Sequence, residues 1–219
     1  MADCAPISPK KRDAIKFKQL VLRPNTYFIY GGDTVDKGPG DVRMVRALVS
    51  LKKRYPDRVH LLVGNRDLNK LRLSSELSES DMKRPIDDIG RPFWDRTAKS
   101  LREHLEEIQE NEGSDLDKLN TRAERLRYML KHTLGCPDTF EFRREEMQIL
   151  TQIYGQYPPN VEHHDITPIH TKLDAEETIS IKVTDDEVVD SFLYEMSPVG
   201  SLRQYLQKSS IAAIVGSEY

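Results

Sequence analysis

The fold of this chain is decided by the stretch Gly31-Gly32-Asp33-Thr34-Val35-Asp36-Lys37-Gly38. It follows directly on Tyr27-Phe28-Ile29-Tyr30, a short aromatic and β-branched run that is typical of a buried strand. The glycines allow a tight loop in which the backbone approaches a ligand closely. Paired carboxylates in such a loop are hard oxygen ligands, which suit Mg²⁺, Mn²⁺ or an Fe/Zn pair. The same pattern is also typical of a turn in which Asp33 or Asp36 accepts hydrogen bonds from nearby amides.

A second strand is predicted at Val59-His60-Leu61-Leu62-Val63, which ends at the turn Gly64-Asn65-Arg66-Asp67. Between the two strands, apolar residues recur at helical spacing from about Asp41 to Tyr55, and Pro56 ends this helix. A strand, a helix and a strand with short loops form a βαβ unit, so the strands should be parallel and adjacent. Both glycine-bounded loops then lie at the carboxyl edge of the sheet, where open α/β sheets bind ligands.

Together the two loops place metal-binding oxygens and a fixed positive charge at one edge of the sheet. The residues concerned are Asp33, Asp36, Asn65, Arg66 and Asp67. That set suits a phosphate ester, because metal ions polarise the phosphoryl group and an arginine binds its oxygens in a bidentate manner. Taken alone, the second loop is also typical of a turn in which Asn65 caps a helix.

The rest of the sequence predicts a large helical insertion. From Leu71 to Pro159 the chain is highly charged and helical in pattern. Apolar positions form two stripes, Leu101-Leu105-Ile108 and Leu116-Leu119-Ala123-Leu126-Leu130, the second spaced like a coiled-coil seam. We therefore predict a helical hairpin followed by a third helix over residues 143–154. Beyond the insertion, short strands are predicted at 179–183 and 211–216, and helices at 186–194 and 200–208.

These elements give an α/β fold with a parallel or mixed sheet. The predicted organisation is a leader (1–26), an α/β core (27–70 and 160–219) and the helical insertion (71–159). The insertion follows the Gly-Asn-Arg-Asp loop directly, so it is expected to overhang the site as a cap.

Composition excludes several classes of protein. The 219 residues contain 33 Lys and Arg against 36 Asp and Glu, a net charge of -3, so the chain has no basic nucleic-acid footprint. No apolar run approaches the length of about 18 residues that a membrane-spanning helix needs. Cys4 and Cys136 are too few for a disulfide framework. We expect an intracellular, cytoplasmic protein.

The two loop motifs resemble the second and third motifs of the calcineurin-like metallophosphoesterases, G-D-x-x-D-R-G and G-N-H-D/E. The resemblance implies a metal-dependent phosphoester hydrolase with two divalent ions (Mn, Fe, Zn or Mg), acting on a phosphoprotein or a small phosphoester. By the same resemblance, Asp33 bridges the two metals, Asn65 binds the second metal, and Asp36 orients the metal ligands. Lys37 stands where the protein-phosphatase branch has a phosphate-contacting arginine. An ammonium, which acts as a point charge, thus replaces a guanidinium that can bind phosphate in a bidentate manner.

Two departures from the family pattern affect the chemistry. The family's motif histidine, assigned to protonating the leaving group, is Arg66 here, which stays charged and stabilises developing charge without donating a proton. Asp67 is then expected to pair with Arg66. In addition, the D-x-H motif that begins the family pattern and the histidine motifs that end it are absent, although residues 211–216 resemble the segment leading into the latter.

Two alternatives follow from these departures. In the first alternative the chain is a truncated or degenerate homologue without catalytic activity that acts through its helical arm. The leucine seam at 116–130 would then bind a protein partner, or helices within 101–130 would self-associate. The other alternative is a site for one metal ion that is completed by His163, His164 or His170.

Overall fold

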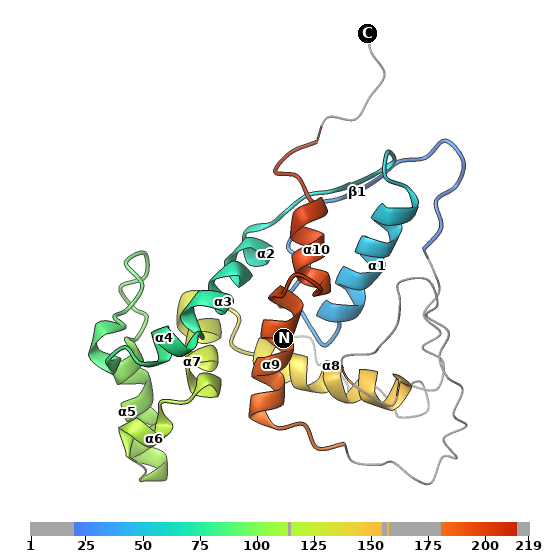
Figure 1. Cartoon of the computed structure of the whole chain (residues 1–219). Coiled ribbons are helices and arrows are strands. Elements are labelled where there is room, and N and C mark those ends of the chain that lie inside the picture. Colours follow the sequence, from blue (N-terminus) through green and yellow to red (C-terminus); the bar gives the residue numbers. More distant parts are fainter. Residues whose placement is uncertain (1–19, 114, 155–156, 158–180, 214–219) are drawn as a thin grey trace, which may run out of the picture.

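The βαβ unit predicted from the sequence is present in the computed structural model, which describes residues 20–113, 115–154, 157 and 181–213. Strand β1 (Phe28–Tyr30) pairs in parallel with β2 (Val59–Leu61), and helix α1 (Asp41–Arg54) connects them. In the register, Phe28 lies opposite Val59. Within the described residues the fold is mixed α/β and mostly helical, with this small parallel sheet (Figure 1).

The helices that follow occupy most of the chain. They are α2 (Asn65–Asn69), the 3₁₀ turn η2 (Lys70–Arg72), α3 (Leu73–Glu76), α4 (Glu79–Met82), the 3₁₀ turn η3 (Ile86–Asp88), α5 (Leu101–Glu112), α6 (Leu116–Leu119), α7 (Arg122–Tyr128), the π-helical turn η4 (Met129–Thr133), α8 (Thr139–Tyr154), α9 (Asp185–Met196) and α10 (Ser201–Lys208). No helix among the described residues has both the length and the apolar character needed to cross a membrane.

The sheet is covered by α1 and α10, which share one hydrophobic core with it. Val45, Leu48 and Val49 of α1 are buried against Val59 of β2 because they recur on one helical face. Tyr205 of α10 is fully buried, and its hydroxyl donates a 2.5 Å hydrogen bond to the Leu62 carbonyl. This core fixes the carboxyl ends of both strands.

The predicted C-terminal strand is only partly correct. Ser210 forms a parallel bridge with Leu62, so a third segment pairs with the sheet beyond β2. The pairing falls one residue before the predicted strand, and the side chain of Ile211, predicted to be buried, is 90% exposed. Ile211 to Ala213 are not in a strand, and residues 214–216 lie outside the described residues. Residues 181–183, predicted as part of a strand, are irregular, and 179–180 also lie outside.

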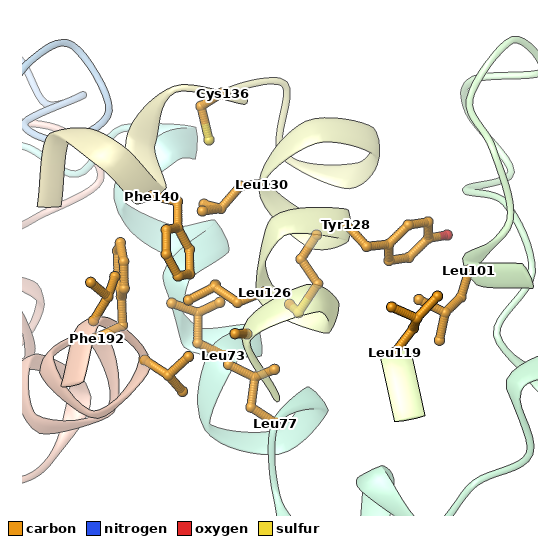
Figure 2. Packing of buried hydrophobic residues seen from close by; sticks show 14 of the residues in the cluster. Leu73, Leu77, Leu101, Leu119, Leu126, Tyr128, Leu130, Cys136, Phe140 and Phe192 are labelled. Carbon is orange, nitrogen blue, oxygen red and sulfur yellow. The ribbon is translucent and has the colours of Figure 1, made fainter. Parts of the chain in front are cut away.

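A second, larger core joins the helices between α3 and α9. Figure 2 shows Leu126 and Leu130 beside Phe140 of α8 and Leu73 of α3. Phe192 of α9 packs into the same cluster. The leucines of the predicted seam are thus core residues, and the prediction that this seam is a free surface for a protein partner is wrong. An apolar stripe at helical spacing predicts that its side chains are buried, but it does not identify the residues that cover them.

The predicted helical hairpin is also corrected by the structure. The helix α5 begins at a Ser100 cap, whose side chain accepts a hydrogen bond from the Glu103 amide, and ends at Gly113 in the left-handed conformation, as a turn requires. The second arm, however, is broken between α6 and α7, where Thr121 caps a new helix by accepting from the Glu124 amide. The arm is therefore not one continuous coiled-coil helix.

A pair of histidines lies where α5 meets η4. The rings of His104 and His132 have centroids 5.4 Å apart, and His132 Nε2 is buried without a hydrogen-bond partner. Burial lowers the pKa of His132 to about 4, and the neighbouring His104, Lys131 and Lys99 act in the same direction. His132 is therefore neutral in the folded protein at neutral pH.

This histidine predicts a loss of stability in mild acid. Between about pH 6.5 and pH 4 the unfolded chain protonates His132 and the folded chain does not, so the free energy of unfolding falls as the pH drops through this window. The variant His132→Gln should show a flatter dependence in urea unfolding at several pH values. Asp41 titrates in the same range and changes the free energy of unfolding in the opposite direction. The contribution of His132 is therefore read from the difference between the two proteins, in which the contribution of Asp41 cancels. Parallel curves for the two proteins would contradict the prediction.

Candidate functional site

The loops after β1 and β2 meet backbone to backbone. At Gly32 a Cβ atom would lie 2.4 Å from the Gly64 nitrogen, and at Gly64 it would lie 2.1 Å from Asp33 Oδ1. No side chain fits at either position, so glycine is required there for close approach. The parallel pairing of the strands thus brings the two sequence motifs into direct contact, as the sequence predicted.

Asp67 joins the two loops through its carboxylate. Its Oδ2 accepts hydrogen bonds from the amides of Asp33 and Gly64, both at 2.9 Å, and its Oδ1 accepts from the Thr34 amide at 2.8 Å. The side chain is fully buried, and burial raises its pKa although these amides act in the opposite direction. Asp67, rather than Asn65, therefore binds the amide of Gly64, the residue that precedes α2.

The expected pairing of Asp67 with Arg66 is not formed. Arg66 instead lies 3.7 Å from an oxygen of Asp36, which is also 2.6 Å from the ammonium of Lys70. Asp36 and Lys70 are both buried, with side-chain exposures of 1% each. The prediction failed because the three amides around Asp67 already occupy its oxygens, and Arg66 turns toward the less satisfied carboxylate. Lys70 was not singled out in the sequence.

The backbone of the first loop is strained at both of its carboxylate residues. Asp33 has a φ of 53° and Asp36 a φ of 77°, which place them in the left-handed region that side-chain-bearing residues seldom occupy. Aspartate tolerates this conformation better than most residues. Such strain persists only where surrounding contacts impose it, and it often marks functional loops.

Two further acidic residues hold this loop and the start of α1, and neither was found from the sequence. Both oxygens of Asp41 accept from the Asp36 amide at 3.2 Å, and burial raises the pKa of the Asp41 carboxyl to about 6 against the influence of Arg143. Glu146 of α8 is fully buried and accepts from the amides of Val42 and Arg43. An acidic residue in the first helical turn is a weak signal for Asp41, and Glu146 has no local signal.

Asp33, Lys37 and Asn65 are the exposed members of the predicted set. Asp33 Oδ1 accepts from the Arg66 amide at 3.1 Å, whereas Lys37 and the Asn65 side chain form no ion pair or hydrogen bond within the described residues. The edge of the sheet therefore offers to solvent one carboxylate, one amide group and one ammonium, while Asp36 and Asp67 are used to hold the loops.

The exposed donors are of the kind that suits a hard divalent cation. A carboxylate from Asp33 and an amide oxygen from Asn65 suit an ion such as Mg²⁺, which keeps several waters and binds through few protein ligands. Within the described residues no group of three or more His, Cys, Asp or Glu side chains is placed to hold a metal ion. The alternative ligands His163, His164 and His170 lie outside the described residues.

Comparisons with known proteins agree with the motifs. The family model for calcineurin-like phosphoesterases matches residues 11–195. The PP2A-like serine/threonine-protein phosphatase PPG1 of Saccharomyces cerevisiae is 46% identical over 44 residues, which are 20% of this chain and 12% of that protein. The chain thus spans only a small part of this relative. No solved structure gives a significant match. Because the family model covers most of the sequence, the chain belongs to the calcineurin-like phosphoesterase family.

Proposed function

We propose that this chain hydrolyses phosphoesters with the help of divalent metal ions, with Asp33 and Asn65 among the metal ligands. The observation that supports the proposal most is the exposure of these two oxygen donors at the carboxyl edge of a parallel sheet, on loops that are linked to each other by hydrogen bonds. A bound divalent ion would supply Lewis acidity toward the phosphoryl group. The family in general acts on phosphoesters through divalent ions.

The chain's own residues have separate tasks in this proposal. The exposed ammonium of Lys37 and the guanidinium of Arg66 bind phosphoryl oxygens and stabilise the negative charge that develops on them. Arg66 remains protonated, so the proton for the leaving group comes from water. Asp36 and Asp67 fix the loops, because the first is neutralised by Lys70 and the second accepts three amide hydrogen bonds. Metal ligands beyond Asp33 and Asn65 would be water or substrate oxygens.

The helical segment 71–159 forms an insertion in the same proposal. Its helix α8 supports the start of α1, because Glu146 accepts hydrogen bonds from the amides of Val42 and Arg43. The earlier alternative, an interaction protein that works through the leucine seam, loses its surface because Leu119, Leu126 and Leu130 are buried. Phosphoester hydrolysis is therefore the better-supported function.

The expected result is that Asp33→Asn abolishes metal-stimulated hydrolysis of p-nitrophenyl phosphate. Even residues that only support a metal ligand change metal affinity or activity by about 10- to 100-fold, so loss of a ligand carboxylate should cost at least that much. Activity and bound manganese are measured together, since asparagine keeps the size of the side chain but removes its charge. The matched control is Asp57→Asn, at an exposed aspartate in the turn before β2.

Two outcomes would count against the proposed function. Wild-type protein that neither binds Mn²⁺, Mg²⁺, Zn²⁺ or Fe²⁺ nor hydrolyses the ester contradicts catalysis by this chain. Hydrolysis that survives in Asp33→Asn at the level of Asp57→Asn contradicts the assignment of Asp33.

A further inference from the structure

Positive charge gathers at the C-terminal end of α1, close to the amino ends of both strands. Six lysine and arginine residues from three parts of the chain contribute to it, and we call them the basic patch: Arg23, Lys52, Lys53, Arg54, Arg58 and Lys208. In Figure 1 the blue segment before β1 and the end of α1 lie on the side of the molecule away from α5. The end of α1 is therefore at the opposite edge of the sheet from the loops that carry Asp33 and Asn65.

Hydrogen bonds fasten the segment before β1 to the end of α1. The guanidinium of Arg54 donates to the Leu20 carbonyl, and that of Arg58 donates to the Arg23 carbonyl at 2.9 Å. Both acceptors are neutral, so each guanidinium keeps its full positive charge. The exposed side chain of Arg23 is thereby held next to the cations of α1 and of the turn before β2.

The helix α10 adds a further cation to the same surface. The ammonium of Lys53 donates to the side chain of Gln204 at 2.9 Å, which places the end of α1 against α10. Partial burial lowers the pKa of Lys53, and the nearby charge of Lys208 acts in the same direction. The two ammonium groups are thus close enough to repel one another.

The basic patch has no carboxylate partner. None of its six cations forms an ion pair within the described residues, whereas Arg72 and Arg84, for example, are paired with Glu76 and Asp81. A helix dipole favours cations at the end of each helix, but it does not account for bringing the ends of two helices and Arg23 together, because like charges repel. An anionic partner relieves this repulsion.

Exposed aliphatic side chains stand next to the cations. Leu20 and Val21 are 43% and 68% exposed. Residues 10–18, outside the described ranges, continue the same composition in sequence, with five Lys and Arg against one Asp and with Ile15 and Phe17 among them. The phosphate backbone of a nucleic acid offers no apolar surface to such residues, whereas the interface of a lipid bilayer takes up cations and aliphatic groups together.

We propose that the basic patch binds the surface of a membrane that contains anionic lipids, with Leu20 and Val21 inserted among the headgroups. Clusters of about four to eight lysines and arginines attract acidic lipids in this way. Such binding is peripheral and needs no membrane-spanning helix. It leaves the loops of the candidate site, at the other edge of the sheet, open to solvent, and it does not depend on the proposed hydrolysis.

Co-sedimentation of the full chain with vesicles tests the inference. One vesicle preparation contains phosphatidylcholine alone, and the other contains phosphatidylcholine and phosphatidylserine at about 3:1. The patch variant combines Arg23→Gln, Lys53→Gln and Lys208→Gln, which remove three exposed cations. We expect the wild type to bind only the vesicles with phosphatidylserine, and less tightly as salt is added, because salt screens the attraction.

A matched control variant separates the patch from net charge. It combines Lys83→Gln, Arg96→Gln and Lys118→Gln, which also remove two exposed lysines and one exposed arginine that form no ion pair within the described part of the chain. Each cation near an anionic membrane strengthens binding by about fivefold, so the patch variant should bind about 100-fold more weakly than the wild type. The control variant should bind like the wild type.

A single apolar substitution tests the insertion of aliphatic side chains. Val21→Ser should weaken binding to the vesicles with phosphatidylserine by about tenfold, because the valine no longer leaves water on binding. Val199→Ser is the matched control, since Val199 is 65% exposed between α9 and α10, and it should leave binding unchanged. Equal effects of the two substitutions would contradict the insertion.

Other outcomes overturn the inference. Absence of binding at low salt, or equal binding to both vesicle preparations, shows that the patch does not recognise anionic lipids. An equal loss in the patch variant and in its control shows that net charge alone is responsible. A single-stranded RNA or a polyglutamate peptide that binds at least as tightly as the vesicles, and does so equally in Val21→Ser, identifies a nucleic acid or an acidic protein as the partner instead. Vesicle binding is measured without hydrolysis, so a failure here leaves the proposed function standing, and the reverse also holds.

Discussion

Replacing Lys70 by methionine should destabilise the protein by about 3–5 kcal/mol, the usual cost of removing one partner from a buried ion pair. Methionine has nearly the same length and no charge, so the change leaves the buried carboxylate of Asp36 without its 2.6 Å partner. The lower end of the range applies, because Arg66 remains 3.7 Å from the same carboxylate. Urea unfolding at neutral pH measures the difference.

A double variant separates the lost charge pair from lost packing. Asp36→Asn removes the carboxylate and keeps a residue that tolerates the left-handed backbone at this position. Lys70→Met with Asp36→Asn should therefore lose less stability than the sum of the single variants, because no charge is left buried and unpaired. Lys53→Met, at an exposed lysine of α1, is the matched control and should change stability by less than about 0.5 kcal/mol. Strict additivity would refute the ion-pair account.

The second large effect is expected at Asp67. Asp67→Ala removes the acceptor of three amide hydrogen bonds, from Asp33, Thr34 and Gly64. Each buried donor left without an acceptor costs about 1–3 kcal/mol, so the total loss should be about 3 kcal/mol or more. Asp67→Asn should be intermediate, since its amide group keeps one acceptor oxygen but points N–H donors toward backbone donors.

The control for this prediction is another aspartate of the same unit. Asp57 is exposed in the turn before β2, and Asp57→Ala should change the free energy of unfolding by less than about 0.5 kcal/mol. If Asp67→Ala is as mild as Asp57→Ala, the two loops are held by something other than this carboxylate. Amide hydrogen exchange at Thr34 gives an independent readout, because that amide is protected by Asp67 Oδ1.

The βαβ unit could be predicted because its signals are local. Two short apolar runs, the helical spacing of Val42, Val45 and Val49 and the glycines after each strand are sufficient for the strands, α1 and their parallel pairing. α9 and α10 were predicted from the same kind of pattern, and both are present. The break before α7 had a local signal too, since Thr121 and Glu124 have the spacing of a helix cap. The regular spacing of the leucines across this break favoured one continuous helix instead.

The internal support of the site could not be predicted, because it depends on partners far apart in the sequence. Lys70 and Asp36 are separated by 34 residues, and a buried lysine has no sequence signature of its own. The same holds for Glu146. The motif residues themselves divide into exposed Asp33, Lys37 and Asn65 and buried Asp36 and Asp67, and only the three-dimensional contacts distinguish the two groups.

The contact between Glu146 and the first turn of α1 has a consequence for synthesis. The acceptor and the Val42 amide are 104 residues apart, so both sequence motifs leave the ribosome well before the carboxylate that supports the start of α1. Domains generally fold as units once their chain is available. The start of α1, beyond the loop that carries Asp33, should therefore reach its final arrangement only after α8 has been made, and a nascent chain that stops short of this helix would contain both motifs without this support.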